Sequence, residues 1–255
     1  MLLGAAYWKY RIWDLERLMT FYEVRKNFPD PAGQHLIALV IEGKIDAALA
    51  AAKTVPGGIN AAGTNGLTPL MTAVLRLDQP MVEALLAAGV NPNGDVKQVP
   101  LHMAVRARDL TIARTLLAGG ADPNGLPGSE PPLMEAATVN YFEAAELLLT
   151  AGARADAPNE LGETAAMSAA AAHHIGMTNY LLDRGASIWA ASQVGFTVAG
   201  FAASVCERAG SVDDDCRRIS SRIKAAGYPW PAPSPKEVRK LMDEGKWPPE
   251  QAGSQ

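Results

Sequence analysis

The sequence predicts an all-α solenoid of about six helix-turn-helix units with a helical cap at each end. Two observations carry this prediction. The segment LLAAGVNPNGDVKQVPLHMAV, from Leu85 to Val105, returns in a similar form from Leu116 to Ala137, and a period of about 20–50 residues indicates stacked repeats. Hydrophobic residues make up 48% of the 255 residues and aromatic residues only 6%, which favours closely packed small helices over a β-sandwich.

Three series of residues define the period of the repeat. Turn glycines follow one another at steps of 31, 32 and 33 residues, at Gly89, Gly120, Gly152 and Gly185. A second series has steps of 31, 32, 33 and 33 residues, at Leu70, Leu101, Leu133, Ala166 and Ala199. A third, mostly polar series accompanies them, at Asn60, Asn93, Asn124, Asp156 and Trp189. Because these series drift together, chance similarity is a poor explanation.

Each unit is expected to contain two helices and a polar connection to the next unit. The first helix follows a start such as Thr68–Leu70, because proline suits the first helical position. The second helix ends at the turn glycine, since a left-handed conformation costs glycine little. A polar stretch such as Asn60–Leu67 then leads onward. Each pair of helices is too small to bury its own apolar face, so it must stack on its neighbours.

The two ends of the chain read as caps. An amphipathic helix is expected over Arg11–Val24, and a capping box of Ser234 with Glu237 predicts a helix near the C-terminus. Atypical end units are expected because an array must present a polar outer face to water. The predicted organisation is an N-terminal helical cap, the repeats, and a C-terminal capping helix with a tail, at residues 1–33, 34–228 and 229–255.

Three stretches of the chain resemble the ankyrin repeat family: NGLTPLMTAV at 65–74, VPLHMAV at 99–105 and GADPNG at 120–125. The resemblance covers most of the chain and implies a stack of two-helix units joined by hairpin-like fingers. The chain departs from the family pattern at the turn between the two helices of a unit. The family's glycine is present there only as Gly43, and the same place is taken by Leu77, Arg108, Asn140 and His173.

The sequence offers no sign of an enzyme, a metal site, a cofactor or a small-molecule substrate. The four histidines lack metal-ligand spacing, and His102 matches the structural histidine of the family. Three aspartates, Asp213–Asp215, lack the alternation of a calcium loop and are read as a solvated loop. The net charge of -4 argues against nucleic acid, and no apolar run reaches the length of about 18 residues that spans a membrane.

The two cysteines predict a disulfide and an oxidising compartment. Gly185 and Gly227 lie 42 residues apart, nine more than a step of 33, and Cys206 and Cys216 bracket the insertion. We expect a disulfide that staples this long connection between the helices of the sixth unit. Because disulfides persist in oxidising compartments, we expect a periplasmic or exported protein. The alternative, two unrelated buried thiols in a cytoplasmic protein, remains open at this point.

The N-terminal residues allow two readings. The apolar start of Met1–Trp13 is too short for a normal signal peptide, and it fits the end of a membrane anchor that lies upstream of this chain. Lys9 and Arg11 argue against a periplasmic side for the residues after such an anchor, because basic residues favour the cytoplasmic side. The same residues fit equally well the first turn of a capping helix.

By resemblance to the family, we expect a non-enzymatic scaffold that binds another protein with a concave face of fingers and first helices. A more specific expectation is an exported immunity or inhibitor protein that neutralises a toxin or effector. The alternative is a regulatory or protective partner of an enzyme, for example in oxidative-stress defence.

Acidic residues slightly outnumber basic ones in the expected partner-facing set, which favours a neutral-to-basic partner. The resemblance places this set at Thr64, Asn65, Leu67, Leu75, Arg76, Asp95, Val96, Gln98, Arg106, Ala107, Glu130, Thr138, Val139, Glu160, Leu161, Glu163, Arg184, Gln193, Val194 and Phe196.

Overall fold

The chain forms two compact units, residues 1–121 and 122–255, each with its own stack of helices. The structure is a computed structural model and describes residues 27–28, 30–95, 98–208, 213–229 and 231–249. The expected N-terminal helix at Arg11–Val24 lies outside these residues. Within them the fold is helical, and the only β-type pairs are two isolated bridges, Asp95 with Gln98 and Ala191 with Thr197.

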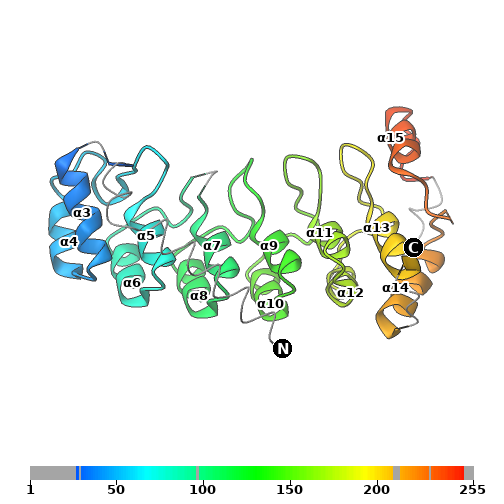
Figure 1. Cartoon of the computed structure of the whole chain (residues 1–255), viewed down its shortest axis with the longest axis horizontal. Coiled ribbons are helices and arrows are strands. Elements are labelled where there is room, and N and C mark those ends of the chain that lie inside the picture. Colours follow the sequence, from blue (N-terminus) through cyan, green and yellow to red (C-terminus); the bar gives the residue numbers. More distant parts are fainter. Residues whose placement is uncertain (1–26, 29, 96–97, 209–212, 230, 250–255) are drawn as a thin grey trace. The chain divides into compact units, whose positions relative to one another are not determined.

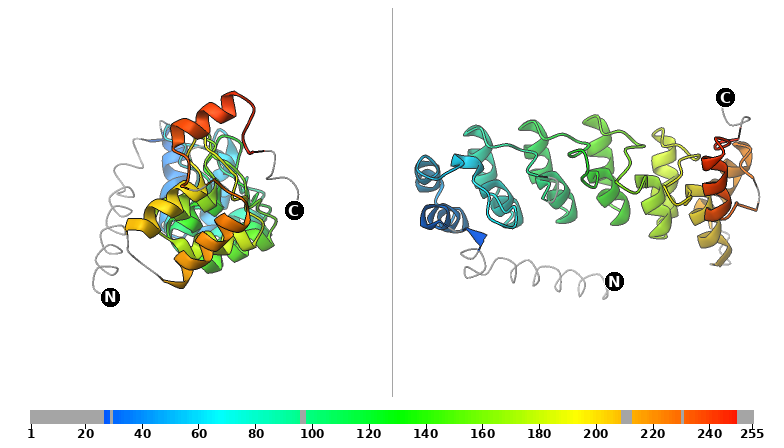
Figure 2. Two further views of the ribbon diagram at one scale, coloured as in Figure 1. Left: turned by 90° about the vertical axis from the view of Figure 1, so that its right-hand side faces the viewer. Right: turned by 90° about the horizontal axis from the view of Figure 1, so that it is seen from above.

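The first unit contains three helix pairs, which lie side by side (Figures 1 and 2). The pairs are α3 (Pro31–Ile41) with α4 (Ile45–Ala52), α5 (Pro69–Leu75) with α6 (Gln79–Ala87), and α7 (Pro100–Arg106) with α8 (Leu110–Ala118). A short 3-10 helix, η1 (Gly58–Asn60), follows α4. The first helices pack on one another in the order α3, α5, α7, and the second helices in the order α4, α6, α8.

The second unit contains three more pairs and an additional helix. The pairs are α9 (Pro132–Thr138) with α10 (Phe142–Thr150), α11 (Ala165–Ala171) with α12 (Ile175–Asp183), and α13 (Val198–Arg208) with α14 (Asp214–Ala225). Helix α15 (Pro235–Asp243) follows them. Helix α11 packs on α9 and on α13, and α12 packs on α14. The six described pairs match the number of units that the period predicts.

Side-chain caps set where the helices begin. The Thr68 hydroxyl accepts a hydrogen bond from the backbone N–H of Met71 at 3.1 Å, and proline occupies the next position. The second helices α6 and α8 begin at Asp78 and Asp109, whose carboxylates accept backbone N–H groups at 3.1 and 2.9 Å. These bonds satisfy donors that the first turn of a helix leaves unpaired. The predicted capping box of α15 is confirmed.

The turn between the two helices of a repeat needs a left-handed residue even where the chain has no glycine. Gly43 has φ 69°, and the residues in its place in four later repeats adopt the same conformation: Leu77 at 55°, Arg108 at 59°, Asn140 at 54° and His173 at 66°. A side chain costs about 1–2 kcal/mol in this conformation. The turn geometry therefore overrides the preference of the residue, and the sequence did not reveal this conformation.

Consecutive repeats are joined by a recurring bond at the base of the fingers, the loops that connect one repeat to the next. A side-chain oxygen of one finger accepts a backbone N–H of the following finger, about one repeat away. Asn60 accepts from Asn91 at 2.7 Å in the first unit, and in the second unit Asn124 accepts from Arg154 at 2.8 Å and Asp156 from Ser187 at 2.8 Å. Three members of the polar series, Asn60, Asn124 and Asp156, are thus hydrogen-bond acceptors.

This series ends at Trp189, whose side chain accepts no hydrogen bond and packs instead against two other aromatic rings. Its ring stacks on Tyr228 with centroids 4.7 Å apart, and Trp247 packs edge-on at 5.7 Å. The Trp247 indole donates to the Trp189 carbonyl at 3.1 Å, and the Tyr228 hydroxyl donates to the Thr197 hydroxyl at 2.8 Å. Burial raises the pKa of Tyr228 to about 12. The cluster covers the last finger with rings where an inner repeat has another finger.

The sixth repeat contains the predicted disulfide. Cys206 lies in α13 and Cys216 in α14, with an S–S distance of 2.00 Å and Cα atoms 5.7 Å apart. The interpretation of the insertion as a loop was wrong in part. Helices α13 and α14 have 11 and 12 residues, against 7 and 9 in α11 and α12, so most of the additional length extends helices.

The three consecutive aspartates belong to the start of α14 and are not a solvated loop. The Asp213 carboxylate accepts the N–H of Cys216 at 2.7 Å and caps the helix, and Asp214 and Asp215 lie in its first turn. Carboxylates at this end of a helix are favoured by its dipole. Farther along α14, Arg218 and Arg222 pair with Asp183 of α12 and lower the pKa of that carboxyl, with the Arg222 hydrogen bond as the largest cause.

Removing the disulfide should loosen the sixth repeat without unfolding the rest of the chain. Replacing Cys206 and Cys216 by serine is expected to lower the free energy of unfolding by about 2–3 kcal/mol, because a cross-link over about 10 residues restricts the unfolded chain. Urea unfolding of this variant and of wild type, with and without reductant, measures the loss. A reductant that destabilises both proteins equally would contradict the prediction.

Replacing Leu77, which has a left-handed backbone conformation, by glycine should stabilise the first unit. Leu77 is 45% exposed, so replacing it by glycine removes little packing. We expect a gain of about 0.5–1 kcal/mol, the conformational cost of a side chain at this φ less the entropy cost of glycine. Thermal unfolding checks this against Leu77→Ala, which removes the side chain and keeps the Cβ. The prediction fails if the alanine variant is as stable as the glycine variant.

Candidate functional site

The fingers carry the candidate site, and backbone carbonyls join their tips. In the first unit the Gln98 side chain donates to the Asn65 carbonyl at 2.6 Å. In the second unit Gln193 makes two such bonds, from its N–H to the Leu161 carbonyl at 2.8 Å and from its side chain to the Glu160 carbonyl at 2.7 Å. Neighbouring tips are therefore held in register, and their remaining side chains are free to face a partner.

Most of the expected partner-facing residues are accessible. Those exposed on fingers or first helices are Thr64, Asn65, Arg76, Arg106, Glu130, Thr138, Glu160, Leu161, Gln193, Val194 and Phe196. Those partly buried are Leu75, Asp95, Gln98, Ala107, Val139 and Glu163. Val96 lies outside the described residues. Exposure permits contact with a partner and does not by itself assign one.

Two residues of the expected set lie elsewhere. Leu67 is only 5% exposed and packs with Phe28, Ile37 and Met71, because the finger turns back toward the core just before α5 and the side chain points inward. Leu67 therefore supports the fold and is withdrawn from the partner-facing set.

Arg184 follows α12, a second helix, and not a finger. Its guanidinium lies 4.7 Å from the ring centre of Tyr180 and 3.5 Å from the Glu146 carboxylate of α10. These contacts tie it to the surface of the second helices. Figure 1 shows α10, α12 and α14 on the side of the second unit opposite to its fingers, so Arg184 belongs to a different surface from the rest of the set.

Exposed apolar side chains gather at two neighbouring fingertips of the second unit. Among the described residues five large apolar side chains are exposed, and three of them are Leu161 at 57%, Val194 at 58% and Phe196 at 39%. The Phe196 ring stacks on Phe201 with centroids 5.2 Å apart. An apolar group exposed on bonded, well-ordered tips is typical of a surface that binds another protein.

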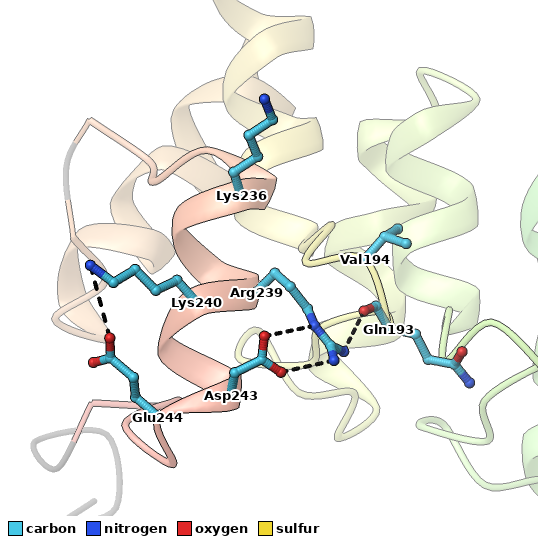
Figure 3. Close-up of a pocket in the computed structure, with 7 residues that line it drawn as sticks. All are labelled: Gln193, Val194, Lys236, Arg239, Lys240, Asp243 and Glu244. Carbon is cyan, nitrogen blue, oxygen red and sulfur yellow. Dashed lines mark hydrogen bonds and ion pairs between the residues drawn. The ribbon is translucent and has the colours of Figure 1, made fainter.

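Helix α15 lies beside these tips, and the sequence had not associated it with the site. The Arg239 guanidinium donates to the Gln193 carbonyl at 2.7 Å, as the glutamines of the fingers do for the preceding tips. At Gly195, φ 88°, a Cβ would come within 2.0 Å of the Pro235 carbonyl oxygen, so a larger residue would separate the helix from the finger. The resulting cleft, between Gln193, Val194 and α15, has a volume of about 620 Å³. Figure 3 shows the residues that line it.

The charges along this cleft are unevenly paired. Asp243 is held by Arg239 at 2.8 Å, and Glu244 by Lys246 at 2.8 Å, with Lys240 at 3.9 Å. The hydrogen bond from Lys246 keeps the pKa of Glu244 below its usual range. Lys236 forms no ion pair with any described residue and extends away from the others in Figure 3. The residues that line the cleft therefore carry more positive than negative charge.

The described residues provide neither a cluster of metal ligands nor a membrane-spanning helix. They contain no group of three or more histidine, cysteine, aspartate or glutamate side chains arranged to hold a metal ion. No helix among them is both long enough and apolar enough to cross a membrane. A second cleft of about 330 Å³ lies between the finger at residues 122–131 and residues 154–158 of the next finger, and five of its eleven lining residues are glycine or proline.

The comparisons with known proteins agree with this geometry. A family model described as ankyrin repeats in three copies matches residues 35–127 and 125–192, more than half of the chain. No curated protein matches the chain. Ankyrin repeats generally act as scaffolds for interactions between proteins. On the matched repeats, the six helix pairs and the bonded fingers, the chain belongs to the ankyrin repeat family.

Proposed function

We propose that this protein is a non-enzymatic scaffold that holds one protein partner on its fingers and the adjoining ends of its first helices. The observation that carries the proposal is the exposed apolar group at Leu161, Val194 and Phe196. Exposing such side chains to water is unfavourable, and the fold itself does not bury them. A partner that covers them recovers this energy, and aromatic residues such as Phe196 are frequent binding hot spots.

The more specific proposal is an exported immunity or inhibitor protein that neutralises a toxin or effector. The disulfide between Cys206 and Cys216 supports export, because such bonds persist in the periplasm and outside the cell. A rigid surface that needs no chemistry of its own suits the neutralisation of a partner, since binding alone can block it. Affinity purification from the native organism, with identification of the captured protein, tests this role.

The captured protein decides between this role and the alternative. For an immunity role it should be toxic when expressed alone, and co-expression of this protein should restore growth. An enzyme whose activity or oxidative inactivation changes when this protein is deleted would favour the regulatory or protective alternative.

Replacing Arg76, Arg106 and Phe196 together by alanine should weaken capture of the partner by several kcal/mol if they include hot spots. All three are exposed on fingers or at the ends of first helices, so thermal stability should change little. Calorimetric titration with the purified partner measures the loss.

The matched control is Arg114, Arg217 and Phe142, replaced by alanine on second helices. Phe142 is 38% exposed, against 39% for Phe196. This control should bind like wild type. A control variant that loses binding, while the finger variant keeps it, would assign the partner to the second helices.

The disulfide also predicts the redox state of the cysteines in the native compartment. Protein isolated from its native compartment without reductant, and denatured in the presence of a thiol reagent, should show no free thiol, because Cys206 and Cys216 are joined. After reduction the same assay should show two. Two thiols per chain before reduction would place the protein in a reducing compartment and remove the main support for export.

A further inference from the structure

The two exposed fingertips and α15 form one continuous surface in the second unit. Leu161 and Val194 lie on tips that are joined by the bonds of Gln193 to the Leu161 and Glu160 carbonyls. The second of these tips is joined to α15 by the Arg239 hydrogen bond and by the tight fit of Gly195 against Pro235. A partner segment that lies across the tips therefore meets α15 next.

The cleft at this junction is already shaped before anything binds. One wall is the fingertip, fixed by hydrogen bonds to the preceding finger. The other wall is α15, whose start is fixed by the capping box of Ser234 and Glu237 and whose Val238 is fully buried. A preformed cleft loses little conformational entropy when it is filled.

The charges of the cleft select the kind of segment that fits. Lys236, Arg239 and Lys240 line it together with Asp243 and Glu244, and both carboxylates are already engaged by cations. Lys236 has no anionic partner among the described residues, and Lys240 only shares Glu244 at 3.9 Å. The exposed Val194 lies at the edge of the same cleft.

We propose that α15 extends the binding surface beyond the repeats, and that its cleft receives an acidic segment of the partner protein anchored by one apolar side chain. This inference rests on the protein-binding role proposed above. The apolar anchor lies against Val194, and its neighbouring carboxylates pair with Lys236 and Lys240. A nucleic acid is disfavoured as the occupant, because the chain as a whole has a net charge of -4, whereas domains that bind nucleic acid are usually basic.

The expected finger residues are slightly acidic and favour a neutral-to-basic partner, whereas the cleft beside α15 favours an acidic segment. One partner can satisfy both, with its basic groups on the fingers near Glu160 and its acidic segment in the cleft. The proposal concerns this segment alone. It can therefore fail while the scaffold role stands.

A library of random 12-residue peptides displayed on phage provides the probe. Selection on the full chain should enrich peptides with aspartate or glutamate beside an apolar residue. Fluorescence anisotropy should then show that Lys236→Glu combined with Lys240→Gln weakens the enriched peptides by about tenfold or more. Added salt should weaken wild-type binding as well, because the pairs are exposed. Val194→Ser should weaken the same peptides without changing the salt dependence.

A matched control makes the same change of charge away from the cleft. Lys224 on α14 and Lys53 after α4 are both exposed, and Lys224→Glu with Lys53→Gln should bind the peptides like wild type. Thermal unfolding and circular dichroism of both double variants should match wild type, which excludes loss of folding.

Several outcomes would overturn the inference. The enriched peptides could lack acidic residues, or the control could lose as much affinity as the cleft variant. Self-association of the chain that disappears in the cleft variant would make the cleft an interface between copies, and binding of an unrelated oligonucleotide as tightly as the peptides would make it a general anion site. If the native partner is lost with the finger variant and kept with the cleft variant, the scaffold role holds and the role of α15 falls.

Discussion

Each two-helix repeat leaves a broad apolar face that only a neighbour can cover, and the rest of the structure depends on this requirement. The first helices satisfy it with small side chains. In α11 five of the seven residues are buried, four of them alanines, so neighbouring backbones can approach closely. In the last repeat of the second unit the finger is covered by Tyr228, which stacks on Trp189, and by Trp247, which packs edge-on to both rings.

The groups that bond neighbouring fingers to one another differ from the side chains that face outward. At the base of the fingers, Asn60, Asn124 and Asp156 accept N–H groups of the next finger, and at the tips the accepting groups are backbone carbonyls. Because backbone carbonyls occur in every residue, the side chains of the accepting residues can vary without loss of these bonds, whereas the donor side chains of Gln98 and Gln193 cannot. The exposed Leu161 occupies a position of this kind, since its carbonyl accepts the Gln193 N–H.

The repeat period predicted the helix pairs, the Ser234–Glu237 motif predicted the capping of α15, and the two cysteines that bracket a long step predicted the disulfide. Each of these features depends on residues close in the chain or on a repeated pattern. It did not predict the left-handed conformation of Leu77, since leucine carries no preference for it and the turn imposes it. The spacing of Gly185 and Gly227 revealed the insertion but not that α13 and α14 absorb most of it.

The candidate site was only partly predictable, because the repeat pattern reports a residue's place within its repeat but not its contacts with distant residues. Of the described residues assigned by their place in the repeat, all but Leu67 are exposed or partly exposed, although Arg184 lies on the surface of the second helices. The Leu67 side chain points inward where the finger turns back. The position of α15 depends on contacts between residues 46 apart, such as Arg239 with Gln193, and no repeated pattern marks that contact.

The bond between Arg239 and the Gln193 carbonyl also bears on how many repeats the chain can carry. The carbonyl accepts an arginine here just as the Glu160 carbonyl accepts the side chain of Gln193, so it does not distinguish a closing helix from another finger. A repeat added before the last one would meet compatible neighbours on both sides. This bond therefore does not depend on the number of repeats before it, whereas the rings of Trp189, Tyr228 and Trp247 pack only on the last finger.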